Sequence, residues 1–441
     1  MIDSSYDNSS SFKEKKQKLN DSFYFQITDK CIGCTKCAKV CPVSCISGKI
    51  KEKHVIDTEK CVKCGQCISA CPMGALPTID FTLNLKNILN KKNKLIIAQV
   101  APSIRATLGE YFGLEPGTLV TGKLVSALRA LGFDKVFDTD FAADLTIVEE
   151  ATEFVHRLKN KGKLPILTSC CPGWINFFEH DFNDLADIPS TCKSPQQMFG
   201  TIAKTYLANK MNINPDDIIV VAVMPCLAKK YEAARPEMTT NGIRDVDIVI
   251  STKELAELIK ENEIDFVSLE NDEFDNPLGE STGAGTIFGA SGGVAEAAIR
   301  TAYELLTKKS IPIFEFKETR GLEGIKEAEI NINGEIIKIA IANGLDSARK
   351  VLCSIKAGEK NYHIIEIMAC QGGCIGSGLQ PFMKKHQSII EKRSEALYLE
   401  DRNKPLRKSH ENPYVLKIYK EFLGEPFGKK AHEFLHTTYV K

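Results

Sequence analysis

Short apolar runs alternate along this chain with longer stretches in which apolar residues recur every three or four positions. The short runs, which predict buried β-strands, lie at 95–100, 163–169, 217–223, 246–251 and 362–368. The longer stretches, which predict amphipathic helices, lie at 121–133, 143–163, 194–211 and 291–309. Strands that alternate with helices imply parallel sheets flanked by helices, so we expect an α/β fold.

The pattern divides the chain into four expected segments. They are a disordered tail, a cysteine-dense unit, an α/β domain and a helical C-terminal segment, at 1–22, 23–82, 83–395 and 396–441. The tail is rich in Ser, Lys, Asp and Asn and has little to bury. After about Glu391, a charged connection that contains proline leads to two short helices around a turn at Gly424 and Pro426.

Composition limits where this chain works and what it binds. With 57 Lys and Arg against 57 Asp and Glu, no overall field favours nucleic acid or an anionic membrane. Nine of the 16 cysteines lie between Cys31 and Cys71, in a long chain that begins without an apolar export signal. We therefore expect a cytoplasmic protein with thiolate-bound metal. The most apolar stretches, 95–104 and 218–227, are about ten residues long, whereas a membrane helix needs about 20.

The cysteine-dense unit contains the spacing C-x2-C-x2-C-x3-C-P twice, which is the bacterial ferredoxin pattern for two 4Fe-4S clusters. In that pattern the fourth cysteine of each run ligates the other cluster. The predicted ligand sets are Cys31, Cys34, Cys37 with Cys71, and Cys61, Cys64, Cys67 with Cys41. The alternative, a zinc site, prefers two ligand pairs from separate hairpins. Cys45 lies outside the pattern and is expected to be a small buried residue.

Three later segments carry thiols directly after predicted strands: TSCCPGW at 168–174, MPCLAKKYEA at 224–233 and MACQGGCIGSGLQP at 368–381. In α/β sheets ligands collect at the carboxyl ends of strands, so these loops can meet at one point. Their glycines let the backbone approach a bulky inorganic group closely. Unrelated buried cysteines are the alternative, and three such loops after three strands argue against coincidence.

These three loops resemble the signature motifs of the FeFe hydrogenases, and the similarity extends from about residue 25 to the C-terminus. The resemblance implies a two-lobed catalytic domain that holds an H-cluster, a 4Fe-4S cluster linked to a diiron subcluster with CO, CN and azadithiolate. It implies ligation by Cys171, Cys226, Cys370 and Cys374, with Cys374 also bridging to the diiron part.

The resemblance also implies roles for residues around that cluster. Cys170 matches the proton donor to the bridging amine, and Lys229 matches the lysine that holds a cyanide ligand. Glu232 matches a glutamate expected to support this region. The residues expected to pack on the cluster are Ala101, Pro102, Met224 and Met368.

A proton route is expected beside the electron route. Glu150, Glu153 and Arg157 recur at i, i+3 and i+7 of one predicted helix, a spacing that by itself favours a surface ion-pair ladder. The resemblance instead implies a relay in which Glu153 passes protons from Cys170 through Ser190 to Glu150. In that relay Arg157 is expected near the point where protons leave the protein.

The third motif departs from the family pattern. Gln371 stands in place of a proline, and Ser377 and Leu379 stand in place of glycines. We expect these positions near the diiron subcluster, where they would alter hydrogen bonding, gas access or redox potential. Ala228 stands where some members have a serine.

The C-terminal stretch 412–439 resembles the small subunit that some members carry as a separate chain, and its fusion favours a cytoplasmic monomer. His432 and His436 lie four residues apart on a predicted helix. We interpret them as packing or solvent contacts rather than metal ligands, because no carboxylate motif of the zinc proteases accompanies them.

The sequence therefore predicts reversible oxidation of H2 to protons and electrons. The electrons would pass through two 4Fe-4S clusters to ferredoxin or flavodoxin, and dedicated maturation proteins would build the diiron part. Two alternatives share the scaffold: an iron-sulfur assembly factor without a diiron site, and a hydrogen sensor without turnover. The assembly factor typically lacks both the full cluster pair and a thiol like that of Cys170.

Overall fold

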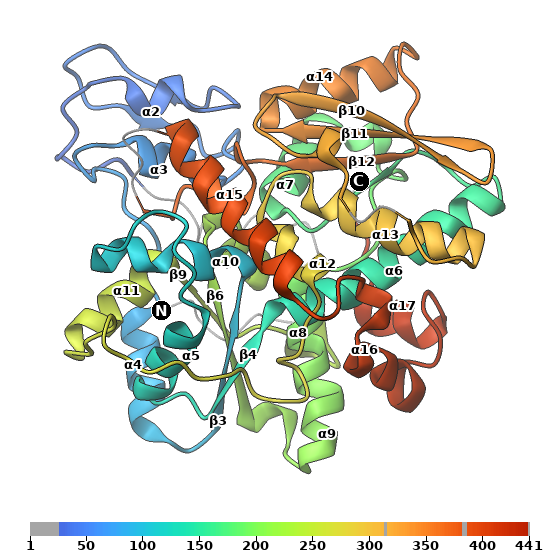
Figure 1. Cartoon of the computed structure of the whole chain (residues 1–441). Coiled ribbons are helices and arrows are strands. Elements are labelled where there is room, and N and C mark those ends of the chain that lie inside the picture. The colour runs from blue at the N-terminus through green and yellow to red at the C-terminus, as the bar shows by residue number, and fades with distance from the viewer. Residues whose placement is uncertain (1–25, 313–314, 382–385, 440–441) are drawn as a thin grey trace.

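Two four-stranded sheets form the centre of the molecule, which we describe from a computed structural model (Figure 1). The structure describes residues 26–312, 315–381 and 386–439, so the tail predicted at 1–22 lies outside the described residues. The sheets confirm the predicted α/β fold. Each sheet has its own hydrophobic core, and the helices lie over the sheets and between them.

The first sheet is parallel throughout, in the order β4-β3-β6-β9. Its strands are Lys135–Asp138 (β4), Leu95–Val100 (β3), Ile218–Met224 (β6) and Ile248–Ser251 (β9). Nearly every side chain of β3 and β6 is buried, because helices cover both faces of a parallel sheet. Val100 pairs with Val223, so β3 and β6 end at the same edge.

The second sheet has the order β10-β11-β12-β5. Its strands are Ile325–Ile332 (β10), Glu335–Asn343 (β11), Ile364–Met368 (β12) and Ile166–Leu167 (β5). The last three are parallel, and β10 adds an antiparallel edge. The hairpin between β10 and β11 was not predicted, although its turn carries the Asn-Gly pair typical of tight hairpins. Asn333 and Gly334 both have positive φ, as such a turn requires.

Most of the remaining helices pack around these sheets. They are α4 (Thr82–Lys91), α5 (Thr121–Ala130), α7 (Pro172–Asp181), α8 (Pro195–Ile202), α9 (Ala208–Met211), α10 (Leu227–Ala234), α11 (Thr252–Glu261), α12 (Gly283–Thr286), α13 (Gly293–Thr307) and α14 (Leu345–Lys356). The segment 203–207 joins α8 to α9 as a π-helical turn, so the helix predicted at 194–211 is continuous but distorted. Two further pairs of two-residue strands are present: β1 (Ile46–Ser47) pairs with β2 (Val55–Ile56), and β7 (Thr239–Thr240) pairs with β8 (Ile243–Arg244).

Helix α6 (Thr139–Lys159) lies between the sheets and contacts α8, α12 and α13. Its first turn is capped by the Asp138 carboxylate, which accepts a hydrogen bond from the Asp140 N–H. Its side chains from 139 to 151 are buried, acidic ones included. A surface ion-pair ladder, the alternative for Glu150 and Glu153, is therefore wrong, and these carboxyl groups lie inside the protein.

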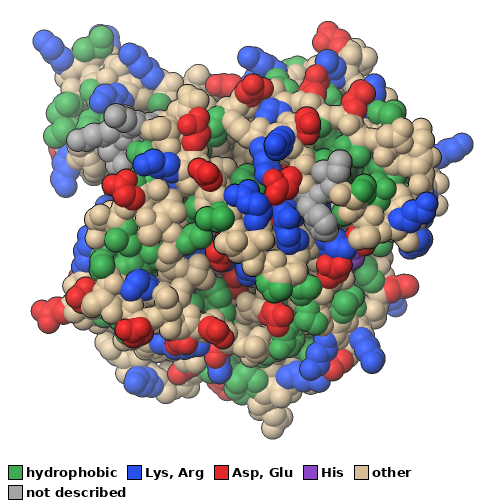
Figure 2. Space-filling model, in the orientation of Figure 1, with side chains coloured by type: hydrophobic (Ala, Val, Ile, Leu, Met, Phe, Trp, Pro, Cys, Tyr) green, Lys and Arg blue, Asp and Glu red, His purple; other side chains and the backbone are tan. Residues whose placement is uncertain are grey.

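The cysteine-dense unit contains two short helices, α2 (Lys36–Lys39) and α3 (Gln66–Ala70), and the strands β1 (Ile46–Ser47) and β2 (Val55–Ile56). It projects from one corner of the molecule, and charges of both signs are interspersed over the face shown (Figure 2). Its second cysteine loop contacts the main body. The Gln66 amide donates to the Gly376 carbonyl at 3.4 Å, and the Asn176 amide donates to the Val62 carbonyl at 3.3 Å.

The C-terminal part begins with a helix that we did not predict. Helix α15 spans His386–Asn403, so the connection expected after Glu391 is helical and the boundary expected at 396 falls inside it. Helices α16 (Pro413–Ile418) and α17 (Lys429–Leu435) follow and lie beside α6 and α8 (Figure 1). None of the helices described is long and apolar enough to cross a membrane.

A buried ion network joins α15 to α13. The Arg300 guanidinium donates to both Asp401 carboxylate oxygens at 2.9 Å and to Glu296 at 2.7 Å, and all three side chains are fully buried. Arg300→Met should lower the free energy of unfolding by about 3 kcal/mol, because it leaves buried carboxylates short of positive charge. Urea unfolding followed by circular dichroism measures this. Lys253→Met, which removes an exposed pair with Glu257, is the control and should change stability by less than about 0.5 kcal/mol.

Candidate functional site

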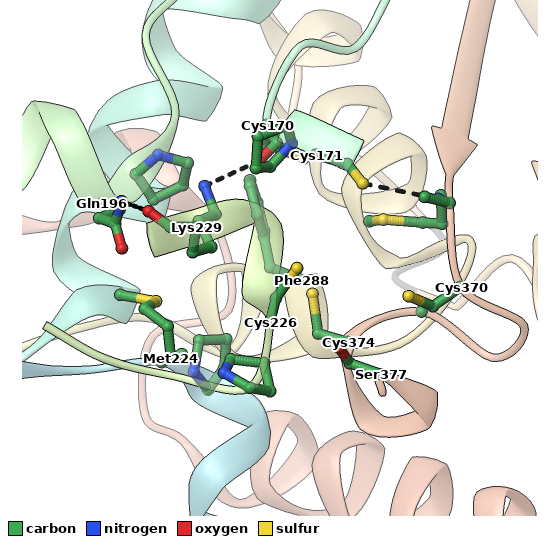
Figure 3. Close-up of a pocket in the computed structure, with 18 of the residues that line it drawn as sticks. Cys170, Cys171, Gln196, Met224, Cys226, Lys229, Phe288, Cys370, Cys374 and Ser377 are labelled. Atoms are coloured by element: carbon green, nitrogen blue, oxygen red, sulfur yellow. Dashed lines mark hydrogen bonds between the residues drawn. The ribbon is translucent and has the colours of Figure 1, made fainter. Parts of the chain in front are cut away.

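A cavity opens where strand ends of the two sheets face each other, with about 690 Å³ free of protein atoms (Figure 3). Strands β3 and β6 of the first sheet bring Ala101, Pro102, Met224 and Cys226 to its wall. The loops after β5 and β12 of the second sheet bring Cys170, Cys171, Met368, Cys370 and Cys374. Parallel strands leave their carboxyl ends at one edge, which is why loops distant in sequence converge here. Thr139, Gln196 and Phe288 also line the cavity and were not predicted, since no motif marks them.

The side chains of Cys171, Cys226, Cys370 and Cys374 gather around this space (Figure 3). Burial raises the pKa of Cys226 to about 11 and that of Cys374 to about 12, and neighbouring thiols add to the effect. Four thiolates in these surroundings, those of Cys226 and Cys370 buried and those of Cys171 and Cys374 half-buried, are therefore unstable without a cation. Iron of a 4Fe-4S cluster is the natural partner for such a donor set, so the residues fit that group.

The backbone around these thiols leaves room for a cofactor only because glycine is present. Gly373 has a φ of 85°, and a Cβ atom there would lie 2.7 Å from the backbone nitrogen of Ser291. Any other residue would push the loop that carries Cys370 and Cys374 away from the cavity.

Among the described residues that line the cavity, Lys229 has the only cationic side chain. Burial opposes its charge, but the Glu232 carboxylate outweighs burial and raises the pKa of the ammonium. The Lys229 amine donates to Glu232 at 2.9 Å and to the Cys170 carbonyl at 3.0 Å. Glu232 lies behind Lys229 rather than on the cavity wall, and it also accepts from Ser194 and Gln196.

Cys170 is the fifth thiol on the cavity wall. Burial raises its pKa well above the usual range, and the neighbouring Glu150 carboxyl adds to the effect. Cys170 is therefore a protonated thiol that can donate a proton toward the cavity. On the side away from the cavity, Cys170 lies near the buried acidic side chains of α6.

A chain of polar groups leads from Cys170 toward the surface, in the reverse of the predicted order. Glu150 follows Cys170 and accepts from the Ser169 N–H at 3.2 Å. Ser190 lies between the two carboxyl groups: it interacts with Glu150 and donates to Glu153 at 2.9 Å. Arg157 donates to Glu153 at the outer end. The order is therefore Cys170, Glu150, Ser190, Glu153 and Arg157. The predicted order, with Glu153 first, is wrong because Glu150 is the residue one helical turn nearer the cavity.

Glu150 has the environment of a neutral carboxyl group. Burial raises its pKa to about 8, and the Glu153 charge adds to the effect, while the Ser169 N–H opposes it. One of its oxygens is buried without a hydrogen-bond partner among the described residues. Around neutral pH this group therefore holds a proton.

The N-terminal unit contains two smaller cavities lined by cysteine, with about 310 and 360 Å³ free of protein atoms. The smaller is lined by Cys31, Cys34, Cys37 and Cys71. The larger is lined by Cys41, Cys45, Cys61, Cys64 and Cys67. The structure thus brings each fourth cysteine to the loop of the other motif, which is the grouping that we predicted.

Cys45 is buried as predicted, but it also borders the larger cavity. Its thiol lies 3.4 Å from the Cys41 thiol, and its N–H donates to the Cys41 sulfur at 3.3 Å. Ala75 occupies the matching position in the second motif, where its N–H donates to the Cys71 sulfur at the same distance. The hydrogen bond from the backbone N–H to the cysteine sulfur is therefore common to both motifs, whereas the Cys45 thiol has no counterpart in the second motif.

Only one of the three altered positions in the third motif lines the large cavity. Ser377 is buried there, and its hydroxyl has no partner among the described residues. Gln371 is exposed, and Leu379 is buried away from the lining residues. Of the three positions expected near the diiron part, Gln371 and Leu379 therefore lie outside the residues that line this cavity.

Comparison with known proteins identifies this arrangement. The family model described as "Iron only hydrogenase large subunit, C-terminal domain" matches residues 94–378. The chain belongs to the iron-only hydrogenase family. The models "Iron hydrogenase small subunit" and "4Fe-4S dicluster domain" match 387–441 and 30–75. Together the family matches support 4Fe-4S clusters in the N-terminal unit and an H-cluster in the large cavity of this hydrogenase-family chain.

Several relatives extend over most of the chain. The NADP-reducing hydrogenase subunit HndD of Solidesulfovibrio fructosivorans is 51% identical over 94% of this chain and 74% of its own length. Iron hydrogenase 1 of Clostridium pasteurianum is 46% identical over 81% of this chain, which spans only 63% of that protein. The FeFe hydrogenase HydA1 of Chlamydomonas reinhardtii superposes with a TM-score of 0.74 at 41% identity, covering 82% of this chain and 99% of that chain. Protein NAR1 of Arabidopsis thaliana is 32% identical over 79% of this chain and 78% of its own length.

Iron content distinguishes Cys41 from Cys45 as the fourth ligand of the larger N-terminal cavity. Cys41→Ala should lower the iron content by about four atoms per chain, the content of one 4Fe-4S cluster. Cys45→Ala, the matched control, should retain the iron because alanine already occupies the equivalent position 75. Iron analysis and electron paramagnetic resonance of the reduced protein measure both. The reverse result would make Cys45 the ligand.

Proposed function

We propose that this chain catalyses reversible oxidation of H2 at an H-cluster held by Cys171, Cys226, Cys370 and Cys374. One observation carries the proposal: the buried relay of proton-bearing groups that begins at the cavity with Cys170 and Glu150. Burying carboxyl groups in a row is costly, and a chain that only bound or delivered clusters would have no use for it. Proton traffic between the cavity and solvent explains this arrangement.

When bound, the H-cluster supplies the iron site and the bridging amine at which H2 is split heterolytically. The chain's own residues handle the proton. Cys170 accepts or donates it at the cavity wall, and Glu150, kept neutral by burial, passes it to Ser190 and Glu153. Lys229 holds a positive charge against the cavity, where it favours an anionic ligand of the cofactor. Apolar side chains such as Phe288 and Met224 exclude water from the same space.

Electrons would take a different direction from protons. Cys64 of the larger N-terminal cavity lies near Cys226 and Cys370 of the large cavity, close enough for their charges to interact. We therefore propose that the N-terminal clusters connect the H-cluster to a small carrier such as ferredoxin or flavodoxin. The 16 cysteines suit a reducing compartment, and we propose the cytoplasm.

Kinship to relatives named as cytosolic Fe-S cluster assembly factors gives the second candidate function, iron-sulfur cluster assembly without turnover. It predicts iron-sulfur clusters without a need for the thiol of Cys170. A hydrogen sensor is the third candidate and would bind H2 with little turnover. The relay favours the enzyme over both.

Hydrogen evolution from a reduced dye, by anaerobically purified protein reconstituted with the diiron cofactor, tests the proposal. Cys170→Ala should lower the rate by at least about 10²-fold, because it removes one positioned proton-transfer group. Its iron content should equal that of the native chain, since Cys170 is outside the proposed ligand set. No evolution by the native chain despite confirmed diiron loading would favour the assembly factor or the sensor.

The raised pKa of Glu150 predicts that Glu150→Gln loses activity but gains stability relative to the native chain as pH rises. Between pH 4.5, the ordinary value, and about 8 the folded protein retains a proton that the unfolded chain has lost. The native free energy of unfolding therefore falls across this window, by up to about 1.4 kcal/mol per pH unit from this group. Glu150→Gln does not titrate, so its stability relative to the native chain should increase from pH 5 to pH 8.

The same variant should lose hydrogen evolution at every pH, because an amide cannot pass a proton on. In the native chain, evolution should decline as pH rises through about 8, where Glu150 loses its proton. Urea unfolding at pH 5 and pH 8 and the pH profile of evolution measure the two effects. A Glu150→Gln chain that evolves H2 at the native rate would remove Glu150 from the relay.

A further inference from the structure

The relay described above ends on a group that cannot itself release a proton. Arg157 forms an ion pair with Glu153 and also donates to the carbonyl oxygens of Ile188 and Pro189. A guanidinium stays protonated at all physiological pH values, so it can stabilise the Glu153 carboxylate but cannot accept its proton. The proton on Glu153 must therefore leave by another contact.

Thr191 supplies such a contact. Its hydroxyl lies 3.4 Å from the Glu153 carboxylate and 2.7 Å from Nδ1 of His436, and its N–H donates to the same carboxylate at 3.2 Å. An ordinary imidazole titrates near pH 6.5, so it accepts and releases protons in neutral solution. Thr191 thus joins the outer carboxyl group of the relay to a histidine of the C-terminal segment.

Backbone hydrogen bonds hold that histidine in place. The Lys193 N–H donates to the Leu435 carbonyl at 2.8 Å, and the Thr437 N–H donates to the Thr191 carbonyl at 2.7 Å. Cys192 and His436 form the antiparallel bridge between them. The C-terminal segment therefore lies along the loop that carries Ser190, so the position of His436 is determined by strand pairing.

Beyond His436, the route reaches solvent through a second ring. The His432 ring lies 4.2 Å from the His436 ring, between centroids, and its side chain is exposed. The Phe427 ring lies within 6 Å of both rings and 5.1 Å from that of His156. Three of the chain's eight histidines thus gather at this point of the surface, beside the outer end of the relay.

We propose that Thr191 and His436 form the outer part of the proton route, which rests on the proposed hydrogenase function. The proton of the Glu153 carboxyl moves to the Thr191 oxygen while the Thr191 hydroxyl proton moves to His436 Nδ1. No electrons move in this step. The imidazolium then releases its extra proton to solvent beside His432, and the steps run in reverse during H2 evolution.

The charges around His436 suit this role. Glu149 faces Nε2 at 3.0 Å and stabilises the imidazolium, and it is itself held by the Tyr419 hydroxyl and the Phe427 N–H. Glu153 and the Cys192 thiol face the ring from the other side, and their atoms lie within 4.8 Å of a ring nitrogen. His156 and His432 complete the surroundings and oppose a second positive charge.

Two substitutions interrupt the route with little change in shape. His436→Gln retains hydrogen bonding to Thr191 and Glu149 but does not titrate, and Thr191→Val removes only the hydroxyl. Thr191→Ser restores the hydroxyl. His410→Gln is the matched control, because His410 also joins a threonine hydroxyl to a glutamate, each at 3.0 Å, and lies outside the relay.

Two measurements are made on the anaerobically purified full chain, in buffer with a chelator that keeps divalent cations off His436. The first is the rate of H2 evolution after loading with the diiron cofactor. The second needs no turnover: the infrared carboxyl band of Glu153, assigned by its loss in Glu153→Gln, is followed after a pH jump in protein that carries only its 4Fe-4S clusters.

His436→Gln and Thr191→Val should each slow both processes by about 10²-fold, the contribution of one positioned proton-transfer group, and the double variant should be no slower. Thr191→Ser and His410→Gln should match the native chain. Native rates in His436→Gln would overturn the proposed route. Failure of the native chain to evolve H2, combined with slow carboxyl equilibration in His436→Gln, would instead contradict the hydrogenase function and leave the route intact.

Discussion

The need to neutralise buried thiolates determines the architecture of this protein. Four cysteines from three loops face one apolar cavity, and burial raises the pKa of each of them. They are stable as ligands only against an iron-sulfur cluster, and they meet only because the strands of two sheets end toward each other. Three features keep these cysteines together: the two sheets, the glycine turn at 372–373, and helix α6 between the sheets.

The same constraint explains why α6 is so acidic inside the protein. Under the proposed function, the cofactor exchanges electrons in a closed cavity and needs a route for protons, and protons need groups that can hold them. Each buried carboxyl group of α6 has its own partners: Asp144 accepts from Thr282, Ser409 and Asn412, and Glu149 from His436 and Tyr419. Asp140 and Glu150 each have one oxygen without a hydrogen-bond partner among the described residues, and burial raises the pKa of both, that of Glu150 to about 8. The helix thus combines carboxyl groups that accept several hydrogen bonds with two that each leave one oxygen without a partner.

Local patterns predicted the parts of this structure that depend on local chemistry. Apolar runs located the buried strands, and cysteine spacing grouped the thiols of the N-terminal unit. The order of the relay depends on which turn of α6 faces the cavity, and spacing at i and i+3 places Glu150 and Glu153 on the same face without giving that direction. The burial of positions 371, 377 and 379 likewise depends on the path of the folded loop, which a motif comparison does not represent. The hairpin at 325–343 was predictable from its Asn-Gly turn.

The C-terminal segment shows how a distant stretch can become part of a site. Nothing in the pattern of 412–439 indicates a partner, because His436 acquires its chemistry only when the segment pairs with the loop at 190–193. Its ring then contributes to the surroundings of two carboxyl groups of α6, Glu149 directly and Glu153 through Thr191. Removing the segment would leave Glu149 buried without its three donors, His436, Tyr419 and Phe427, at a cost comparable to the loss of a buried ion pair. Fusion of the segment to the large domain therefore secures both the stability of α6 and the outer end of the relay, because one strand pairing provides both.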